Sequence, residues 1–193
     1  MIAAALRLGP LLLASRSPQR RAILAQLGIE FEVVHPDYDE SPVGAGDQAE
    51  VARVHAAGKA QAVAAAAAGR PVLGVDTVVA VGGMALGKPV DAAEARRFLE
   101  VLAGRRHEVH SGLCLIAGGR RFPRLATTRV SFRALAAEDV DWYLGSGEWR
   151  ERAGGYAIQG RGAALVAGIE GEYTNVVGLP VAALLDAMGE AVR

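Results

Sequence analysis

The chain has 193 residues, of which 51% are hydrophobic and 22% are charged, and its formal net charge is zero. This length and composition can build one sizeable core, and we expect a single domain that spans residues 1–193. The zero net charge argues against a nucleic-acid-binding protein, because such proteins normally carry a basic surplus or a clustered basic face. No apolar stretch has the length and purity of a membrane span.

Short apolar runs alternate with helical stretches along the chain, which is typical of an α/β domain. A helix is expected to begin at Pro18, because Ser17 can cap it and proline at the first helical position loses no hydrogen bond. A hairpin is expected at Gly82-Gly83, since glycines adopt the positive φ angles of tight turns. The predicted strands are 11–14, 31–34, 72–81, 85–86, 107–117, 125–132, 163–166 and a short one within 170–180. The predicted helices are 18–27, 50–68, 92–102, 137–144 and 180–188.

The chain is expected to be soluble and cytoplasmic. Its single cysteine, Cys114, lies in an apolar run, which excludes a disulfide within the chain and favours a reducing compartment. The apolar start is interrupted by Arg7 and Pro10, which argues against a signal peptide.

The segment SRSPQRR, from Ser15 to Arg21, directly follows the first predicted strand. It brings hydroxyls, an arginine and a helix N-terminus to one place, where free backbone N–H groups and the helix dipole favour negative charge. We interpret it as an anion site with phosphate as the usual occupant. An ordinary capped helix with solvated arginines is the alternative.

Asp76 and Thr77 interrupt an otherwise apolar predicted strand. Because a carboxylate buried there would be costly without a cation or hydrogen-bond donors, we expect its partner to be a divalent metal, Lys88 or both. Such a carboxylate can also orient or deprotonate a water molecule. In the acidic segment 37–40, Asp39 and Glu40 offer further oxygen ligands for magnesium or manganese; a solvated turn is the alternative.

Lys59 and Lys88 are the only lysines among 21 basic residues. Lysine presents a compact ammonium and arginine a planar fork, so a chain that uses arginine elsewhere is expected to keep lysine where phosphate chemistry requires it. Drift towards arginine is the alternative. Gln159, in a glycine-rich segment, carries both a donor and an acceptor, which suits recognition of a nucleobase edge, although a surface loop is equally compatible.

The histidines are not expected to bind a metal. His107 and His110 are three residues apart in a predicted strand and therefore point to opposite faces, and His35 and His55 have no suitable neighbour in sequence. Nucleophilic catalysis is also disfavoured, because no Gly-x-Ser-x-Gly motif is present and Cys114 has apolar neighbours.

From Leu11 to about Ala187 the chain resembles the Maf family of nucleoside triphosphate pyrophosphatases. The matching segments, in chain order, are LLLASRSPQRRAILAQLG, DYDE, HAAGKAQAVA, VLGVDTVVAVGGMALGKPVDAAEA, LAGRRHEVHSGLCL, RAGGYAIQGRGAALV and IEGEYTNVVGLP. The resemblance implies an α/β fold of the Maf/ITPase-like kind, with two lobes around a mixed sheet and a central cleft, and usually a homodimer.

The resemblance also implies hydrolysis of a nucleoside triphosphate between the α and β phosphates, with magnesium or manganese as cofactor and pyrophosphate as a product. Asp76, Lys88 and Glu40 would be catalytic, and Asp76 and Glu40 would bind the metal. The candidate substrate-binding residues are Ser15, Arg16, Ser17, Arg20, Lys59, Thr77 and Gln159.

Thr77 and Gln159 match the branch of the family that acts on dTTP and UTP, which favours a pyrimidine base. Gln19 departs from this branch, which commonly has arginine near the base, and Thr174-Asn175 resembles the branch that acts on 7-methyl-GTP. Two alternatives therefore stay open. One is a house-cleaning pyrophosphatase for modified nucleotides such as 7-methyl-GTP or 5-methyl-UTP, and the other is a binding protein that regulates cell division and septum formation.

Overall fold

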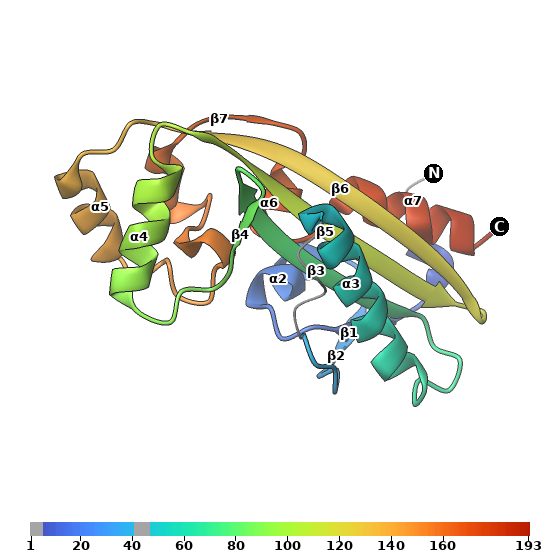
Figure 1. Ribbon diagram of the computed structural model, residues 1–193. Helices are drawn as coiled ribbons and strands as arrows, with labels where there is room; N and C mark the ends of the chain where they lie inside the picture. The colour runs from blue at the N-terminus through green and yellow to red at the C-terminus, as the bar shows by residue number, and fades with distance from the viewer. Residues whose placement is uncertain (1–5, 41–46) are drawn as a thin grey trace.

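A computed structural model describes residues 6–40 and 47–193 (Figure 1). Within these residues the strands form a seven-stranded sheet in the order β2-β1-β3-β5-β6-β7, and β4 pairs with β3 beside this path. The strands are β1 (Leu11–Ala14), β2 (Phe31–Val34), β3 (Val72–Val81), β4 (Met84–Leu86), β5 (Arg106–Ala117), β6 (Arg120–Phe132) and β7 (Val166–Glu170). The helices are α2 (Pro18–Gln26), α3 (Gln48–Ala64), α4 (Ala92–Leu102), α5 (Ala137–Leu144), α6 (Tyr173–Val177) and α7 (Val181–Ala191), with 3-10 turns η1 (Leu6–Leu8), η2 (Ala153–Gly155) and η3 (Gly160–Leu165).

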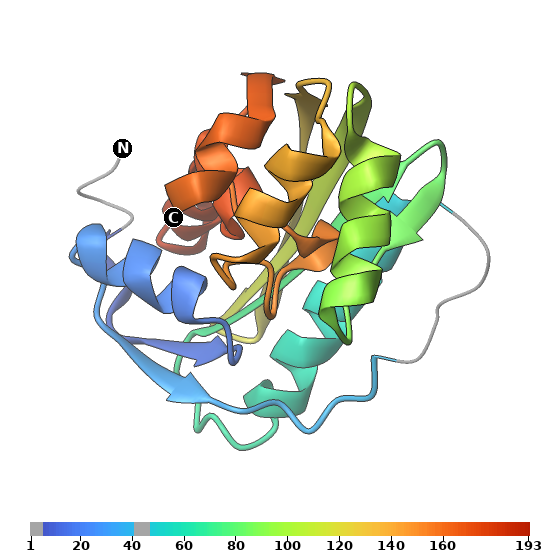
Figure 2. The ribbon, with the colours of Figure 1, turned by 90° about the vertical axis from the view of Figure 1, so that its left-hand side faces the viewer.

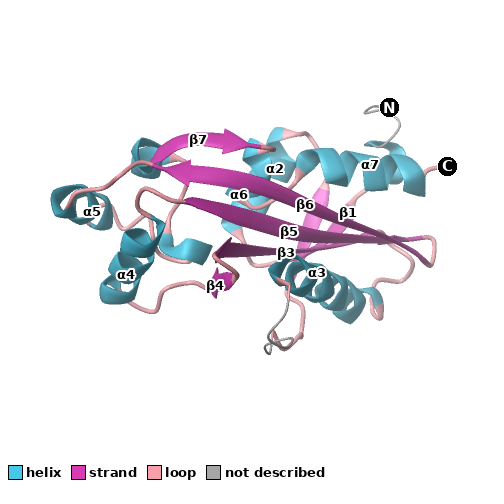
Figure 3. Cartoon of the chain, turned by 45° about the horizontal axis from the view of Figure 1, so that its top comes forward, coloured by secondary structure: helices cyan, strands magenta, loops and turns pink. Residues whose placement is uncertain are grey.

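The sheet is mixed. β1 runs parallel to both β2 and β3, whereas the pairs β3–β5, β5–β6 and β6–β7 are antiparallel. The parallel β1–β2 pair requires a crossover, and α2 supplies it. Helix α3 covers one face of β3 and β5, and α6 and α7 pack on the other face of β5 and β6 (Figure 3).

The hydrophobic core is divided along the length of the sheet. At one end, β1, β3 and β5 pack against α2 and α7 on one face and against α3 on the other. At the other end, β3, β5 and β6 pack against α4 and α5, which lie apart from α2 and α7 (Figure 1) and stand side by side (Figure 2). The predicted α/β fold with two lobes around a mixed sheet is confirmed.

Two glycines let α3 lie unusually close to the sheet. A Cβ atom at Gly74 would fall 2.2 Å from the carbonyl oxygen of Ala56, and one at Gly112 would fall 2.2 Å from that of Ala52. The facing residues of α3 are small, since Ala52, Ala56 and Ala60 recur every fourth position and are fully buried. This contact fixes α3 against β3 and therefore fixes where the side chain of the neighbouring Lys59 points.

The predicted elements are largely confirmed, but α3 is shorter than expected. It ends at Ala64, at the start of the run of five alanines that we assigned to it, and Ala68 and Gly69 adopt positive φ angles. The high helix propensity of alanine is overridden here because the chain must reverse within a few residues to enter β3. Strand β6 in turn begins at Arg120 and not at position 125. It tolerates Pro123 because β7 pairs only with residues 129–132, so that the other edge of β6 has no strand partner at the proline within the described part of the chain.

Two predictions in the last third of the chain are wrong. Residues 163–166 belong mostly to the 3-10 turn η3, and the strand β7 follows at residues 166–170. The short strand expected within 170–180 is the helix α6, which Gly178 ends with a φ angle of 127°. Short apolar runs of this length are ambiguous between strand and helix, and here packing against β5 and β6 decides.

No helix in the described residues is long and apolar enough to cross a membrane. Residues 1–5 of the apolar start lie outside the described part of the chain.

Candidate active site

The candidate site lies at a gap in the strand pairing of β3. Strand β5 pairs with one edge of β3 over residues 72–80, and β1 and β4 share the opposite edge. Because β1 pairs only with residues 72–74 and β4 only with residues 79–81, residues 75–78 have no strand partner on that edge among the described residues. We call this stretch the open edge of β3. It contains Asp76 and Thr77, whose side chains point to opposite faces of the sheet as successive strand residues must.

On the α3 face, Asp76 forms a carboxylate cluster with Lys59 and Glu40. The ammonium nitrogen of Lys59 lies 2.6 Å from Asp76 Oδ1 and 2.8 Å from Glu40 Oε1. Lys59 and Asp76 are buried, whereas Glu40 is exposed. The buried aspartate therefore has the cation that its position demanded, but the cation is Lys59 and not Lys88.

The acidic segment reaches this cluster because Tyr38 holds it against α3. The ring of Tyr38 packs directly on Gly58: a Cβ atom at that position would fall 2.2 Å from Cε2 of the ring, so a larger residue would force the ring to move. The hydroxyl of Tyr38 hydrogen-bonds to Nδ1 of His55, one turn earlier on α3, at 3.1 Å. Partial burial and the nearby carboxylates of Asp76 and Glu40 raise the pKa of Tyr38 above its ordinary value, so it stays neutral at physiological pH.

On the opposite face, Arg20 joins three parts of the chain. Its Nε donates to the carbonyl of Gly178 at 2.9 Å, Nη1 donates to Ser15 Oγ at 2.9 Å, and Nη2 donates to Thr77 Oγ1 at 3.1 Å. Burial lowers the pKa of Arg20 from its ordinary value, partly offset by Asp76 and Glu40, yet guanidinium stays charged in proteins. A guanidinium has five N–H donors, so two stay available for a ligand after these three bonds among the described residues.

Ser15 and Ser17 complete this donor cluster. The Oγ of Ser15 accepts from Arg20 Nη1 and from the backbone N–H of Ser17, the latter at 3.2 Å. Both lone pairs of that oxygen are then used, so the hydroxyl proton of Ser15 can be donated only to a further acceptor. Ser17 caps α2 as predicted, accepting from the backbone N–H of Arg20, and its hydroxyl donates to Gln19 Oε1.

The other predicted residues lie outside these two clusters. Lys88 is exposed and lies 3.4 Å from the exposed Glu151, with no recorded contact to Asp76. Arg16 and Gln159 are also exposed, and no described hydrogen bond links either to the clusters. The structure thus brings together Ser15, Ser17, Arg20, Glu40, Lys59, Asp76 and Thr77.

Glu40 and Asp76 fit the divalent metal that the resemblance implies. Their oxygens converge on one shared cation, the ammonium of Lys59, and carboxylates are the ligands that magnesium and manganese favour. Among residues 6–40 and 47–193, no group of three or more His, Cys, Asp or Glu side chains could hold a metal. Further ligands would therefore come from substrate phosphates and water, which is how magnesium is commonly bound.

Sequence reasoning missed Tyr38 and Ser111. Ser111 of β5 stands opposite Thr77 in the register, and the two hydroxyl oxygens are 2.9 Å apart. A polar residue within the apolar run of β5 was the available signal, but its partner depends on the β3–β5 register. His107 hydrogen-bonds to Tyr156, and His110 hydrogen-bonds to Thr127 on the neighbouring strand β6.

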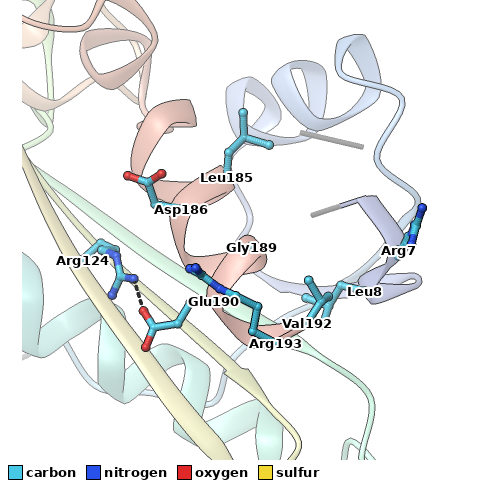
Figure 4. Close-up of a pocket in the computed structure, with 9 residues that line it drawn as sticks. All are labelled: Arg7, Leu8, Arg124, Leu185, Asp186, Gly189, Glu190, Val192 and Arg193. Atoms are coloured by element: carbon cyan, nitrogen blue, oxygen red, sulfur yellow. Dashed lines mark hydrogen bonds and ion pairs between the residues drawn. The ribbon is translucent and has the colours of Figure 1, made fainter. Parts of the chain in front are cut away.

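A cavity of about 1050 Å³ lies elsewhere, beside α7 and η1 (Figure 4). An ion pair between Arg124 and Glu190 lies in its wall. None of the predicted site residues lines it.

The fold and the two clusters define an α/β protein with a set of hydrogen-bond donors beside a pair of carboxylates. The sequence matches the family described as Maf-like protein over residues 10–191, and the chain belongs to that family.

Related proteins match over nearly their whole lengths. A dTTP/UTP pyrophosphatase of Myxococcus xanthus is 49% identical, with 93% of this chain and 92% of that protein covered. Proteins with the same name from Nitratidesulfovibrio vulgaris and Pyrococcus furiosus are 50% and 42% identical, covering 91% of this chain and 84% and 92% of their own lengths. Among solved structures, the Staphylococcus aureus Ham1 protein aligns with a TM-score of 0.44 at 17% identity, over 64% of this chain and 71% of its own.

Proposed function

We propose that this protein hydrolyses nucleoside triphosphates, dTTP and UTP above all, to the monophosphate and pyrophosphate. The observation that carries the proposal is the adjacency of Asp76 and Thr77 on the open edge of β3, which joins a carboxylate cluster to an anion-binding donor cluster. The relatives named dTTP/UTP pyrophosphatase, at 42–50% identity, support the substrate.

The donor cluster is the proposed phosphate site. Arg20 has two N–H groups left for a ligand. The oxygen of Ser15 already accepts two hydrogen bonds, so its hydroxyl proton can be donated to the ligand. The N-terminus of α2, capped by Ser17, adds backbone N–H groups and the positive end of the helix dipole. Arg20 is held by its bonds to Ser15, Thr77 and Gly178 before any ligand arrives, so little reorganisation would be needed during the reaction.

The carboxylate cluster is the proposed water-activating side. Oδ1 of Asp76 is held by Lys59, and its second oxygen can accept a proton from water that attacks the α phosphorus. A magnesium or manganese ion held by Asp76 and Glu40 would polarise phosphate oxygens and lower the pKa of bound water. Lys59 keeps the two carboxylates together and places a positive charge where the phosphates carry negative charge.

The cytoplasmic location, the metal and the homodimer belong to this proposal. Support for them comes from the family resemblance and, for the metal, from the proximity of the Glu40 and Asp76 carboxylates, which share one neighbouring residue, Lys59. Light scattering coupled to gel filtration tests the homodimer, and calorimetry with magnesium and manganese tests the metal.

The activity is tested by pyrophosphate release from dTTP, UTP, CTP, 7-methyl-GTP, 5-methyl-UTP and the common triphosphates, with magnesium and then manganese. Asp76→Asn is expected to lower kcat roughly a hundredfold or more, as for loss of a positioned proton acceptor. Asp186→Asn is the matched control, because Asp186 lies on α7, in the wall of the separate cavity and outside both clusters. Release from 7-methyl-GTP in preference to dTTP and UTP would favour the house-cleaning alternative, and no release from any nucleotide would favour a binding role.

A further inference from the structure

Thr77 of β3 and Ser111 of β5 form a hydroxyl pair at 2.9 Å in which either oxygen could be the donor. We propose that Ser111 is a positioning residue that fixes the direction of this bond, so that the hydroxyl of Thr77 donates out of the pair to an acceptor oxygen of the substrate. The inference rests on the proposed function. It adds that the substrate atom next to Thr77 must be a hydrogen-bond acceptor.

The direction follows first from Ser111. Its side chain is fully buried, and among the described residues its hydroxyl has one hydrogen-bond partner, Thr77 Oγ1. A buried hydroxyl that cannot reach water must donate its proton to a protein acceptor. Ser111 therefore donates, and Thr77 Oγ1 accepts.

The second constraint comes from Arg20. A guanidinium has no acceptor, so its Nη2 must be the donor in the 3.1 Å bond to Thr77 Oγ1. That oxygen then accepts from both Arg20 and Ser111, and a hydroxyl oxygen has two lone pairs. Its own proton can go only to a third group, and Thr77 is only partly buried at the open edge of β3.

The consequence is a discrimination between acceptors and donors on the substrate. A keto oxygen of uracil or thymine, or a phosphate oxygen, can accept the proton of Thr77, whereas an amino group such as that of cytosine cannot. Ser15 is saturated in the same way by the N–H groups of Arg20 and Ser17. The hydroxyls on both sides of Arg20 are thus set to donate.

The test is the specificity constant kcat/KM of Ser111→Ala for UTP and CTP. The substitution frees one lone pair of Thr77, which can then accept from an amino group. If Thr77 contacts the base, we expect the UTP-to-CTP ratio of kcat/KM to fall about tenfold, with an absolute gain for CTP, the size expected from one mismatched hydrogen bond. If Thr77 contacts a phosphate oxygen, kcat/KM should fall for both nucleotides by about the same factor with the ratio unchanged.

Further variants separate positioning from stability. Ser111→Thr keeps the hydroxyl and should restore wild-type behaviour, and Ser111→Ala should add nothing to the loss caused by Thr77→Val. Thr128→Val removes a different fully buried hydroxyl on the neighbouring strand and should lower the melting temperature without changing the ratio.

Unchanged kcat/KM in Ser111→Ala for both nucleotides would overturn the inference, as would full additivity with Thr77→Val. Either result with an active wild-type enzyme would leave the proposed function standing. A wild-type protein that releases no pyrophosphate would instead refute the proposed function itself.

Discussion

Replacing Lys59 by methionine tests whether its ammonium is the cation that makes burial of Asp76 possible. Methionine keeps a straight, unbranched side chain of similar size, so packing against the sheet changes little. The variant leaves the Asp76 carboxylate about nine-tenths buried, without its partner at 2.6 Å. Removing one member of a buried ion pair typically costs about 3–5 kcal/mol, because the remaining charge loses its compensation.

We expect the lower end of that range, about 3 kcal/mol, because Asp76 lies at the open edge of β3, where water can reach it. The double variant Lys59→Met/Asp76→Asn buries no uncompensated charge and should recover about 2 kcal/mol of that loss. Glu40 should contribute less, since its side chain is 59% exposed.

Urea unfolding followed by far-UV circular dichroism measures these free energies. The control is Lys88→Met, which removes the chain's other lysine from a site where its side chain is 63% exposed, and which should change stability by less than about 0.5 kcal/mol. The reasoning is refuted if Lys59→Met costs no more than Lys88→Met, or if the losses in the double variant simply add.

Three further predictions concern the pH dependence of stability, the packing of α3 and the role of Lys88. Burial lowers the pKa of His107 from 6.5 to about 4, so only the unfolded chain takes up this proton as pH falls from 6.5 to about 4. Stability should therefore drop by about 3 kcal/mol over that window. His107→Gln should remove this part of the pH dependence in urea titrations; an unchanged slope would contradict the assignment. Gly112→Ala places a Cβ 2.2 Å from a backbone oxygen of α3 and should destabilise by about 3 kcal/mol. Gly168→Ala meets nothing within 4 Å and is the control, so equal urea midpoints would rule out the close-packing argument. Lys88→Arg should lower kcat at least tenfold if a compact ammonium meets the substrate there. A variant with the kcat of the wild type would mean that Lys88 is a lysine by compositional drift and not for its chemistry.

Much of the local structure could be predicted because its causes are local. Ser17 and Pro18 define the start of α2, and the glycines at 82 and 83 define the β3–β4 hairpin. The failures are short segments, such as the α6 helix, where a few apolar residues satisfy either a strand or a helix. There the choice depends on the neighbouring surface, which the segment itself does not encode.

The candidate site divides in the same way. Sequence alone determined that a carboxylate at position 76 needed a cation, because an unpaired charge within an apolar strand is too costly. It also predicted an anion site after β1, which stays a prediction. Only the tertiary structure decided that Lys59 is the cation. Gly74 and Gly112 let α3 lie close to the sheet, and Tyr38 holds the acidic segment 37–40 against the helix. It also decided that Ser111 meets Thr77, because strand register is a property of two strands and cannot be read from either one.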